Sequence, residues 1–175
     1  MAASANRAAA TELSPRTRVH AIGDGILLLS GPSLNLLGER EPEIYGTTTL
    51  AEIEAIATSA ASAAGLRLVA ALQSNHEGEL IDRLHRRDFD WVLINPGGLT
   101  HTSVSLRDAL LAIERPFAEL HISDPAAREP FRKVNFLEDI AAIKVRGHGA
   151  AGYEIAVKLI AELRAEARAM GTIGA

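Results

Sequence analysis

The chain has 175 residues, of which 47% are hydrophobic, so it is long enough to bury one sizeable core and should fold. Its formal net charge is -4 and no basic cluster stands out, which argues against nucleic acid as a partner. The absence of cysteine excludes disulfides, thiolate metal sites and a thiol nucleophile, and no apolar run approaches the length needed to span a membrane.

The N-terminal segment carries little information. Residues 1–20, MAASANRAAATELSPRTRVH, are rich in alanine and polar residues and lack the apolar core of a signal peptide. Their Arg and Ser content is compatible with an organelle transit peptide, but a tail on a cytoplasmic protein is the simpler interpretation. We expect residues 1–24 to form a disordered N-terminal tail and residues 25–170 to form one domain.

Apolar runs and amphipathic segments alternate along the rest of the chain. In chain order, the pattern predicts a strand at 26–30, a helix at 48–64, a strand at 66–72, a helix at 77–86, a strand at 91–95, a helix at 103–113, strands at 117–122 and 141–145, and a helix at 150–170. Threonines can cap the first helix, which ends at Gly65, and Ser103 can cap the third. The alternation predicts an α/β fold, a flavodoxin-like three-layer sandwich with a five-stranded parallel sheet.

The polar segments that follow the first, third and fourth strands should meet, because ligands bind at the carboxyl ends of parallel strands. The segment after the first strand, residues 31–46, is too long for an ordinary turn and has no clear periodicity, so it should be a mobile lid or binding loop. It contains Arg40 and Tyr45, with Pro42 stiffening the chain between them. A cation near a phenol favours its ionised form, which would make Tyr45 a general base. An exposed arginine and a tyrosine packed on the surface remain the alternative.

The segment after the third strand offers ligand contacts. Gly97 and Gly98 allow the backbone to approach a ligand closely, while Asn95 and His101 supply donors and acceptors. The alternative is structural, with Asn95 ending the strand and His101 serving the start of the next helix.

The segment after the fourth strand adds charge. Strand alternation puts Glu119 and His121 on the same face, so the carboxylate can orient the imidazole or favour its protonated form, which would make His121 a general acid. The backbone N–H groups that follow, of Ile122 and Ser123, can receive a carboxylate. Further along, two arginines four residues apart can form one cationic face, Arg128 and Arg132. A solvated charged turn is the alternative.

Two other patterns are set aside. Residues 147–152 match G-x-G-x-x-G, the dinucleotide fingerprint, but follow the last strand, with no later strand to present a ribose-binding acid. Tight turning and close helix packing explain these glycines better. The six histidines show no metal-ligand spacing, so we expect neither a metal nor an organic cofactor.

Together the loops resemble those of the type II 3-dehydroquinases. The matching strings are GPSLNLLGEREPEIYG, QSNHEGELID, INPGGLTHTSVSLRDAL, ELHISD and AREPFR, and the resemblance runs from about residue 25 to residue 165. It implies a flavodoxin-like catalytic domain, usually assembled as a dodecamer of four trimers. The implied reaction is anti elimination of water from 3-dehydroquinate through an enolate, giving 3-dehydroshikimate, in biosynthesis or in quinate catabolism.

The resemblance also implies roles for individual residues. Tyr45 matches the general base, Arg40 the arginine that keeps it ionised, and His121 the general acid. The residues matching the substrate-binding positions are Asn95, His101 and Arg132 for the hydroxyls, Ile122 and Ser123 for the carboxylate, and Asp108, which is contributed across the trimer interface. Glu119 and Arg128 are expected to support the site.

The sequence departs from the family pattern in two places. Ser33 stands where the family has an asparagine that holds a water near the enolate oxygen, and a serine side chain has a shorter reach. After His121, Ala126 replaces a supporting histidine and Asp124 adds a negative charge near an anion site. Residues 134–136 are VNF where the family has a His-Ser-Tyr-like segment.

These departures keep two alternatives open. One is an active paralogue that acts on a related cyclic keto acid. The other is a non-catalytic oligomer that only binds a ligand, although a mere binder has no need of the matched proton-transfer residues. A flavin-binding or receiver-domain interpretation shares only the fold and explains none of the loops.

Overall fold

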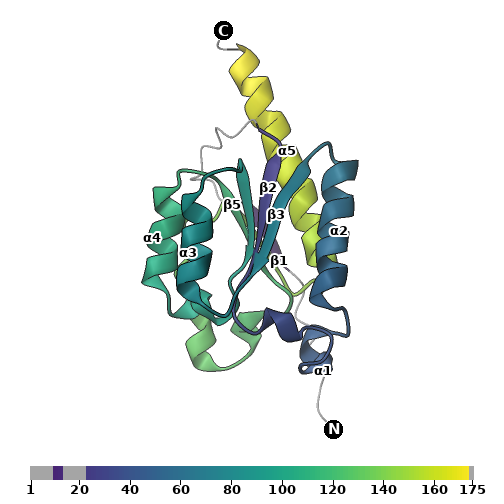
Figure 1. Cartoon of the computed structure of the whole chain (residues 1–175), viewed down its shortest axis with the longest axis vertical. Helices are drawn as coiled ribbons and strands as arrows, with labels where there is room; N and C mark the ends of the chain where they lie inside the picture. Colours follow the sequence, from purple (N-terminus) through teal and green to yellow (C-terminus); the bar gives the residue numbers. More distant parts are fainter. Residues whose placement is uncertain (1–9, 14–22, 174–175) are drawn as a thin grey trace.

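The computed structural model describes residues 10–13 and 23–173, and the described residues fold around one sheet (Figure 1). The sheet has six strands in the order β1-β6-β5-β4-β2-β3. Its parallel strands are β2 (Gly25–Ser30), β3 (Arg67–Gln73), β4 (Trp91–Asn95), β5 (Phe117–His121) and β6 (Ile143–Arg146). The parallel strands have the order expected of a flavodoxin-like fold, so the predicted fold class is confirmed.

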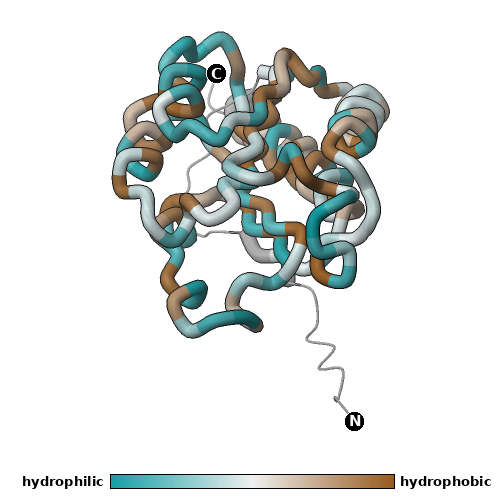
Figure 2. Tube along the Cα trace, turned by 60° about the horizontal axis from the view of Figure 1, so that its bottom comes forward, coloured by the Kyte–Doolittle hydropathy of each residue, from teal (hydrophilic) through white to brown (hydrophobic). Residues whose placement is uncertain are grey.

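Helices cover both faces of the sheet (Figure 1). The pair α2 (Leu50–Ala63) and α5 (Ala151–Ile173) packs on one face, and the pair α3 (Glu77–His85) and α4 (Val104–Ala112) packs on the other. Hydrophobic and hydrophilic residues alternate along the helices, as expected when one side of each helix faces the sheet (Figure 2). None of the helices in the described part of the chain is long and apolar enough to cross a membrane.

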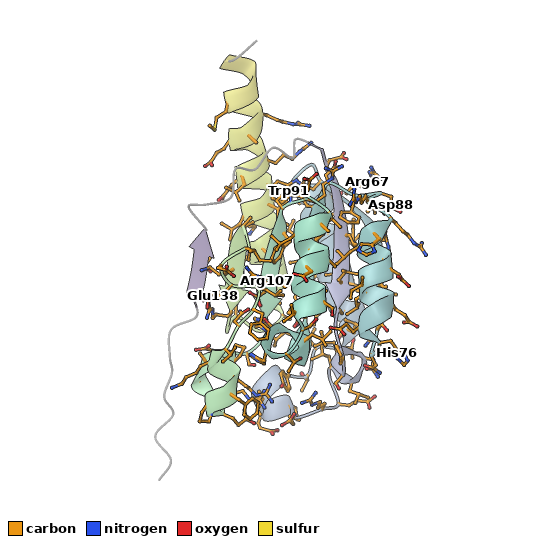
Figure 3. All side chains as sticks on the ribbon, turned by 90° about the vertical axis from the view of Figure 1, so that its left-hand side faces the viewer. Arg67, His76, Asp88, Trp91, Arg107 and Glu138 are labelled. Carbon is orange, nitrogen blue, oxygen red and sulfur yellow. The ribbon has the colours of Figure 1, made fainter. Side chains whose placement is uncertain are left out.

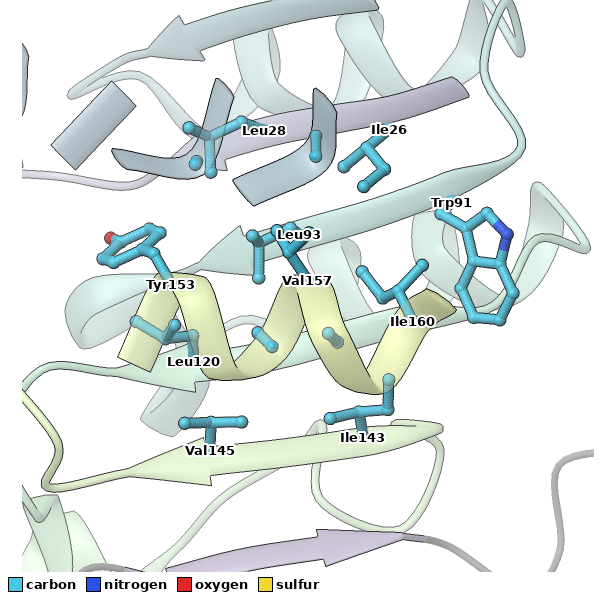
Figure 4. Packing of buried hydrophobic residues seen from close by; sticks show 14 of the residues in the cluster. Ile26, Leu28, Trp91, Leu93, Leu120, Ile143, Val145, Tyr153, Val157 and Ile160 are labelled. Carbon is cyan, nitrogen blue, oxygen red and sulfur yellow. The ribbon is translucent and has the colours of Figure 1, made fainter. Parts of the chain in front are cut away.

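Strand β2 shows how the sheet feeds two cores. Ile26 and Leu28 belong to the cluster under α2 and α5, while Leu27 and Leu29 belong to the cluster under α3 and α4. Successive side chains of a strand point to opposite faces, so a continuous apolar run is what a strand between two helix layers requires. Figure 4 shows the first cluster, in which Tyr153 and other α5 side chains pack across the strands.

The predicted helix caps are present. The Thr49 side chain accepts from the Glu52 N–H and the Glu52 carboxylate accepts from the Thr49 N–H, which together form a capping box at the start of α2. At α4, the Ser103 hydroxyl accepts from the Leu106 N–H at 2.7 Å. Hydroxyl side chains therefore mark both helix starts, as their position in the sequence indicated.

The N-terminal prediction needs a correction. Ala10–Leu13 form β1, which pairs antiparallel with β6, and the Thr11 hydroxyl lies 3.2 Å from His148 Nε2. The sheet therefore has a sixth strand where we expected a disordered tail. A strand of four residues is too short to produce a hydrophobic pattern that can be recognised in a sequence. Most of the predicted tail, residues 1–9 and 14–22, lies outside the described residues.

The long segment after β2 also contains structure that its sequence did not reveal. It forms a short 3-10 helix, η1 (Leu34–Leu36), and a single helical turn, α1 (Pro42–Tyr45). Leu34 and Leu37 are buried and pack against the core under α2, which fixes the first half of the segment. Helices of three or four residues are too short to produce a periodic pattern.

Candidate active site

The carboxyl ends of β2, β4 and β5 border one cavity of about 240 Å³. Further short helices complete its rim: η2 (Gly97–His101), η3 (Pro125–Ala127) and η4 (Pro130–Lys133). Ten of the residues selected from the sequence line the cavity: Ser33, Arg40, Tyr45, Asn95, His101, His121, Ile122, Ser123, Arg128 and Arg132. The three loops therefore converge as the position of the strand ends indicated.

Close backbone packing brings two of these loops together. The Gly31 N–H donates to the Asn95 carbonyl oxygen at 2.8 Å, and a Cβ on Gly31 would lie 2.3 Å from the Pro96 oxygen. Only glycine fits at such a distance. The loop that carries Tyr45 and the loop that carries His101 therefore start from a shared, rigid contact.

Tyr45 lies between two arginines. Arg128 Nη1 donates to the Tyr45 hydroxyl oxygen at 2.6 Å, and the guanidinium carbons of Arg40 and Arg128 lie 5.2 and 5.7 Å from the ring centroid. The expected cation at the phenol is present, but the arginine that contacts its oxygen is Arg128. Arg40 instead pairs through Nε with the Glu41 carboxylate at 2.7 Å. Arg128 and Tyr45 are 83 positions apart in the chain, so nothing in the sequence indicated this contact.

His121 and Glu119 form a buried pair. His121 Nε2 lies 2.9 Å from Glu119 Oε1, and the two side chains are only 10% and 2% exposed. Burial raises the pKa of Glu119, but the hydrogen bond and charge of His121, with donors from Thr100 and Asn135, outweigh it and hold that pKa below its usual value. The carboxylate is therefore ionised at neutral pH. Glu119 does not line the cavity and acts on it through His121.

Thr100 and Asn135 were missed by sequence reasoning. The Thr100 hydroxyl donates to Glu119 Oε1 at 2.5 Å, and Asn135 Nδ2 lies 3.0 Å from each oxygen of the same carboxylate. For Thr100, the sequence indicated only that it lies in the loop after β4. For Asn135, the sequence indicated only that it lies in a segment that differs from the family pattern.

The two remaining polar residues of the β4 loop have defined orientations. His101 Nδ1 lies 2.5 Å from the Val134 carbonyl oxygen, which can only accept, so Nδ1 carries a proton. Nε2 is then the ring nitrogen left to contact a ligand. Asn95 Oδ1 accepts from the Gly97 N–H at 3.2 Å, and its Nδ2 donates to the Tyr153 hydroxyl at 3.3 Å. These hydrogen bonds to neighbouring residues therefore fix the orientation in which His101 and Asn95 line the cavity.

Ser33 occupies an unusual backbone conformation. Its φ is 66° and its ψ is 2°, in the left-handed region that asparagine tolerates better than serine. Its N–H donates to Asn75 Oδ1 at 2.8 Å, and Asn75 also accepts from Gln73 Nε2 at 3.1 Å. Asn75, which sequence reasoning did not select, thus supports the loop from β3.

The two aspartates considered from the sequence lie outside the cavity lining. Asp124 Oδ1 accepts from the Ala126 N–H at 3.1 Å and caps η3, between two residues that line the cavity, Ser123 and Pro125. Asp108 is exposed on α4. A residue that serves a neighbouring subunit would be exposed in a single chain, and its role stays a prediction.

The glycine-rich motif at 147–152 serves packing. A Cβ on Gly152 would lie 3.4 Å from side-chain atoms of Leu120 and Val145. The Gly147 N–H donates to the carbonyl of His121, the last residue of β5, at 3.1 Å, and the Gly149 N–H donates to the carbonyl of the next residue, Ile122, at 2.9 Å. The turn therefore holds α5 close to the strand that carries His121. Within the described part of the chain, no group of three or more His, Cys, Asp or Glu could hold a metal ion.

Comparison with known proteins gives consistent matches. The family model described as "Dehydroquinase class II" matches residues 24–161. The "Catabolic 3-dehydroquinase 1" of Neosartorya fischeri is 51% identical over 142 residues, which are 80% of this chain and 94% of that protein. The "3-dehydroquinate dehydratase" of Corynebacterium glutamicum (strain R) is 54% identical over 141 residues, 79% of this chain and 97% of that protein.

A solved structure agrees with these sequence matches. The crystal structure of type II dehydroquinase from Propionibacterium acnes superposes with a TM-score of 0.74 and 35% sequence identity. The match covers 80% of this chain and 97% of that one.

Proposed function

The chain belongs to the class II dehydroquinase family, and from this we propose that it is a hydro-lyase that removes water from 3-dehydroquinate to give 3-dehydroshikimate. The observation that carries the proposal is that a phenol contacted by a guanidinium and an imidazole paired with a carboxylate line the same cavity. Such a pair supplies the base and the acid that an elimination needs.

Tyr45 is the proposed base. In this role Tyr45 acts as the tyrosinate, and two guanidinium groups place positive charge beside it: Arg128 at 2.6 Å from the phenol oxygen and Arg40 at 5.2 Å from the ring centroid. The tyrosinate takes a proton from C2, beside the ketone, and the electron pair of the C–H bond moves into an enolate. Donors prepositioned around the enolate oxygen stabilise it in the transition state. Ser33 lies on the cavity wall and replaces the family asparagine at this position.

His121 is the proposed acid. Ionised Glu119 accepts from Nε2, which leaves Nδ1 as the nitrogen that can donate to the substrate. As the enolate collapses, the C1–O bond breaks and the imidazolium gives its proton to the departing hydroxyl, which leaves as water. Tyr45 has then gained a proton and His121 has lost one, and exchange with solvent restores both.

The remaining site residues are proposed to hold the substrate. Asn95, His101 and Arg132 would bind its hydroxyls, and the backbone N–H groups of Ile122 and Ser123 would receive its carboxylate. The support for this assignment is their match to the family pattern and their place on the cavity wall.

Turnover of 3-dehydroquinate, followed by the ultraviolet absorbance of the conjugated enone product, tests the proposal. Robust turnover that is lost in Tyr45→Phe and in His121→Gln, but kept in His85→Gln, would support it. His85 is exposed on α3 and gives a matched control for loss of an imidazole. If the folded wild-type protein is inactive on 3-dehydroquinate but dehydrates a related cyclic keto acid, the reaction stands and the substrate is wrong.

The same relatives leave the metabolic role open. Proteins named as catabolic dehydroquinases and proteins named as dehydratases match at similar identity, 51% and 54% in the two cases above. Growth of a deletion strain on quinate, compared with its growth without aromatic amino acids, would separate the two roles.

We also propose an assembly of identical chains, a dodecamer of four trimers, in which Asp108 reaches a neighbouring cavity. The exposed position of Asp108 on α4 supports this, as does the exposure of two apolar residues of the same helix, Val104 and Leu111. Sedimentation that finds an active monomer would contradict it. We further propose that residues 25–170 are the catalytic domain and that the protein works in the cytoplasm, which imaging of the tagged full-length chain would test.

A further inference from the structure

Residues 134–136 form a short strap across η2. The Val134 carbonyl oxygen contacts His101 Nδ1 at 2.5 Å, and the Phe136 N–H donates to the Thr100 carbonyl oxygen at 2.9 Å. Between these two contacts the side chain of Asn135 points to Glu119, 16 residues earlier in the chain. The strap therefore contacts both a substrate-binding histidine and the carboxylate that holds His121.

The orientation of the Asn135 amide is fixed. Its Oδ1 accepts from the Leu137 N–H at 2.7 Å, and a backbone N–H can only donate. The oxygen end of the amide must therefore face Leu137, and the nitrogen end must face Glu119, where it lies 3.0 Å from both carboxylate oxygens. With the amide turned around, two acceptors would meet at Glu119 and two donors would meet at Leu137.

The donors around Glu119 decide the state of His121. A carboxylate with only 2% exposure is costly to keep ionised unless donors replace the lost water. Thr100 and Asn135 supply those donors, both at Oε1, the oxygen that His121 also contacts, and Asn135 at Oε2 as well. Because the carboxylate is then an acceptor only, His121 Nε2 must carry a proton, and Nδ1 is the atom presented to a ligand.

We propose that Asn135 is a positioning residue: it holds the Glu119 carboxylate ionised and in place, and thereby fixes the ring orientation and the protonated nitrogen of His121. The inference rests on the proposed function, because it gives His121 the role of acid. It goes beyond that function by assigning a role to a residue outside the cavity, in the strap where this chain departs from the family pattern.

The first test is kinetic and uses Asn135→Ala and Asn135→Ser. We expect Asn135→Ala to lower kcat on the order of 10²-fold with little change in KM, because general acid catalysis contributes about that much and the cavity wall is intact. The kcat of Asn135→Ser should be close to that of the wild type, since a serine hydroxyl can accept from the Leu137 N–H and donate to Glu119.

Isotope effects separate positioning from a merely structural role. His121 acts only when the C1–O bond breaks, so Asn135→Ala should make that step rate-limiting. The kinetic isotope effect of substrate deuterated at C2 should then fall toward 1, and recovered substrate should exchange its C2 proton with solvent. A variant that loosened the whole site would slow proton abstraction as well and keep the isotope effect. That result, or a kcat equal to wild type, would overturn the proposal.

The second test needs no substrate. Solid-state nitrogen NMR of histidine-labelled protein, with His121→Gln to assign the signal, reads which ring nitrogen of His121 carries the proton. We expect Nε2 to carry a proton in the wild type in both forms of the ring, together with Nδ1 in the imidazolium and alone in the neutral ring, whereas the neutral ring of Asn135→Ala should be a mixture of the two tautomers. An unchanged spectrum in Asn135→Ala would overturn the proposal even if the wild-type protein fails to dehydrate 3-dehydroquinate. Wild-type inactivity with the expected spectra would instead refute the proposed function alone.

Discussion

The buried Tyr153 makes a prediction about stability at alkaline pH. Its hydroxyl has no exposure and bonds with Asn95 and Ser30, and burial raises its pKa from 10.0 to about 12. In the unfolded chain the same phenol should ionise near pH 10, as an exposed tyrosine does. Between these two values the unfolded state loses a proton that the folded state keeps. Stability is therefore intact below about pH 10 and falls as the pH rises toward 12.

The size of the effect follows from the pKa values. A rise from 10.0 to about 12 corresponds to about 3 kcal/mol of lost stability once both values are passed, and about 1.4 kcal/mol at pH 11. Tyr153→Phe removes the titrating group. At pH 7 this variant should be less stable by about 1–3 kcal/mol, because the Asn95 amide loses a buried partner.

The assay compares wild type and Tyr153→Phe in urea at pH 7 and at pH 11. Trp91 is the only tryptophan, is fully buried, and lies at the amino end of β4, far from the cavity, so its fluorescence reports unfolding (Figure 3). All other groups are common to both proteins, so their contributions cancel in the comparison. The stability difference seen at pH 7 should shrink by about 1.4 kcal/mol at pH 11. A difference that is the same at both pH values would refute the reasoning.

Three further predictions concern the loops. Ser33→Asn should raise the unfolding free energy by about 0.5–1 kcal/mol, because asparagine tolerates the left-handed backbone better than serine, and a thermal melt would measure this. The longer side chain of asparagine should also raise kcat. Arg128→Lys should lower kcat on the order of 10²-fold in steady-state assays, because it removes the guanidinium contact to Tyr45. An unchanged kcat would indicate that Arg40, and not Arg128, is the arginine that acts on the phenol. Glu119→Gln should be less stable than wild type at pH 7, and the difference in unfolding free energy should narrow in urea unfolding at pH 4. A lowered carboxyl pKa stabilises fully above the unfolded value of about 4.3, and this stabilisation is lost as the pH falls below it toward the folded value; a constant difference would contradict this.

The sequence revealed those parts of the fold that depend on local pattern. Continuous apolar runs such as 91–95 identify strands buried on both faces, and Thr49 and Ser103 identify helix starts because a hydroxyl must satisfy the first free N–H groups. The convergence of three loops followed from topology alone, since parallel strands end at one edge. The pairing of β1 was not predicted because it depends on backbone hydrogen bonds to β6, a strand about 130 residues later in the chain. Backbone hydrogen bonds do not require a particular pattern of side chains.

The parts of the site that escaped prediction depend on contacts between distant side chains. The sequence placed Arg40 beside Tyr45, since both lie in one segment, but folding brings Arg128 to the phenol oxygen. Tyr153 was read as part of an amphipathic helix, and nothing local indicated that its hydroxyl supports Asn95. A spacing argument identifies residues that share an element, and only the packed structure shows which elements meet.

Strand β1 also limits how copies of this chain can associate. A strand at the edge of a sheet presents unpaired N–H and C=O groups on which another chain can add a strand. The antiparallel pairing of Ala10–Leu13 occupies that side of β6 and makes β1 the edge strand, so a neighbour can extend the sheet there only by pairing with the four residues of β1 or by displacing them. In the described part of the chain, β3 borders the opposite edge and has only β2 as a partner. An assembly that leaves β1 in place therefore has to join its subunits through helices, loops, the β3 edge or the short β1 edge.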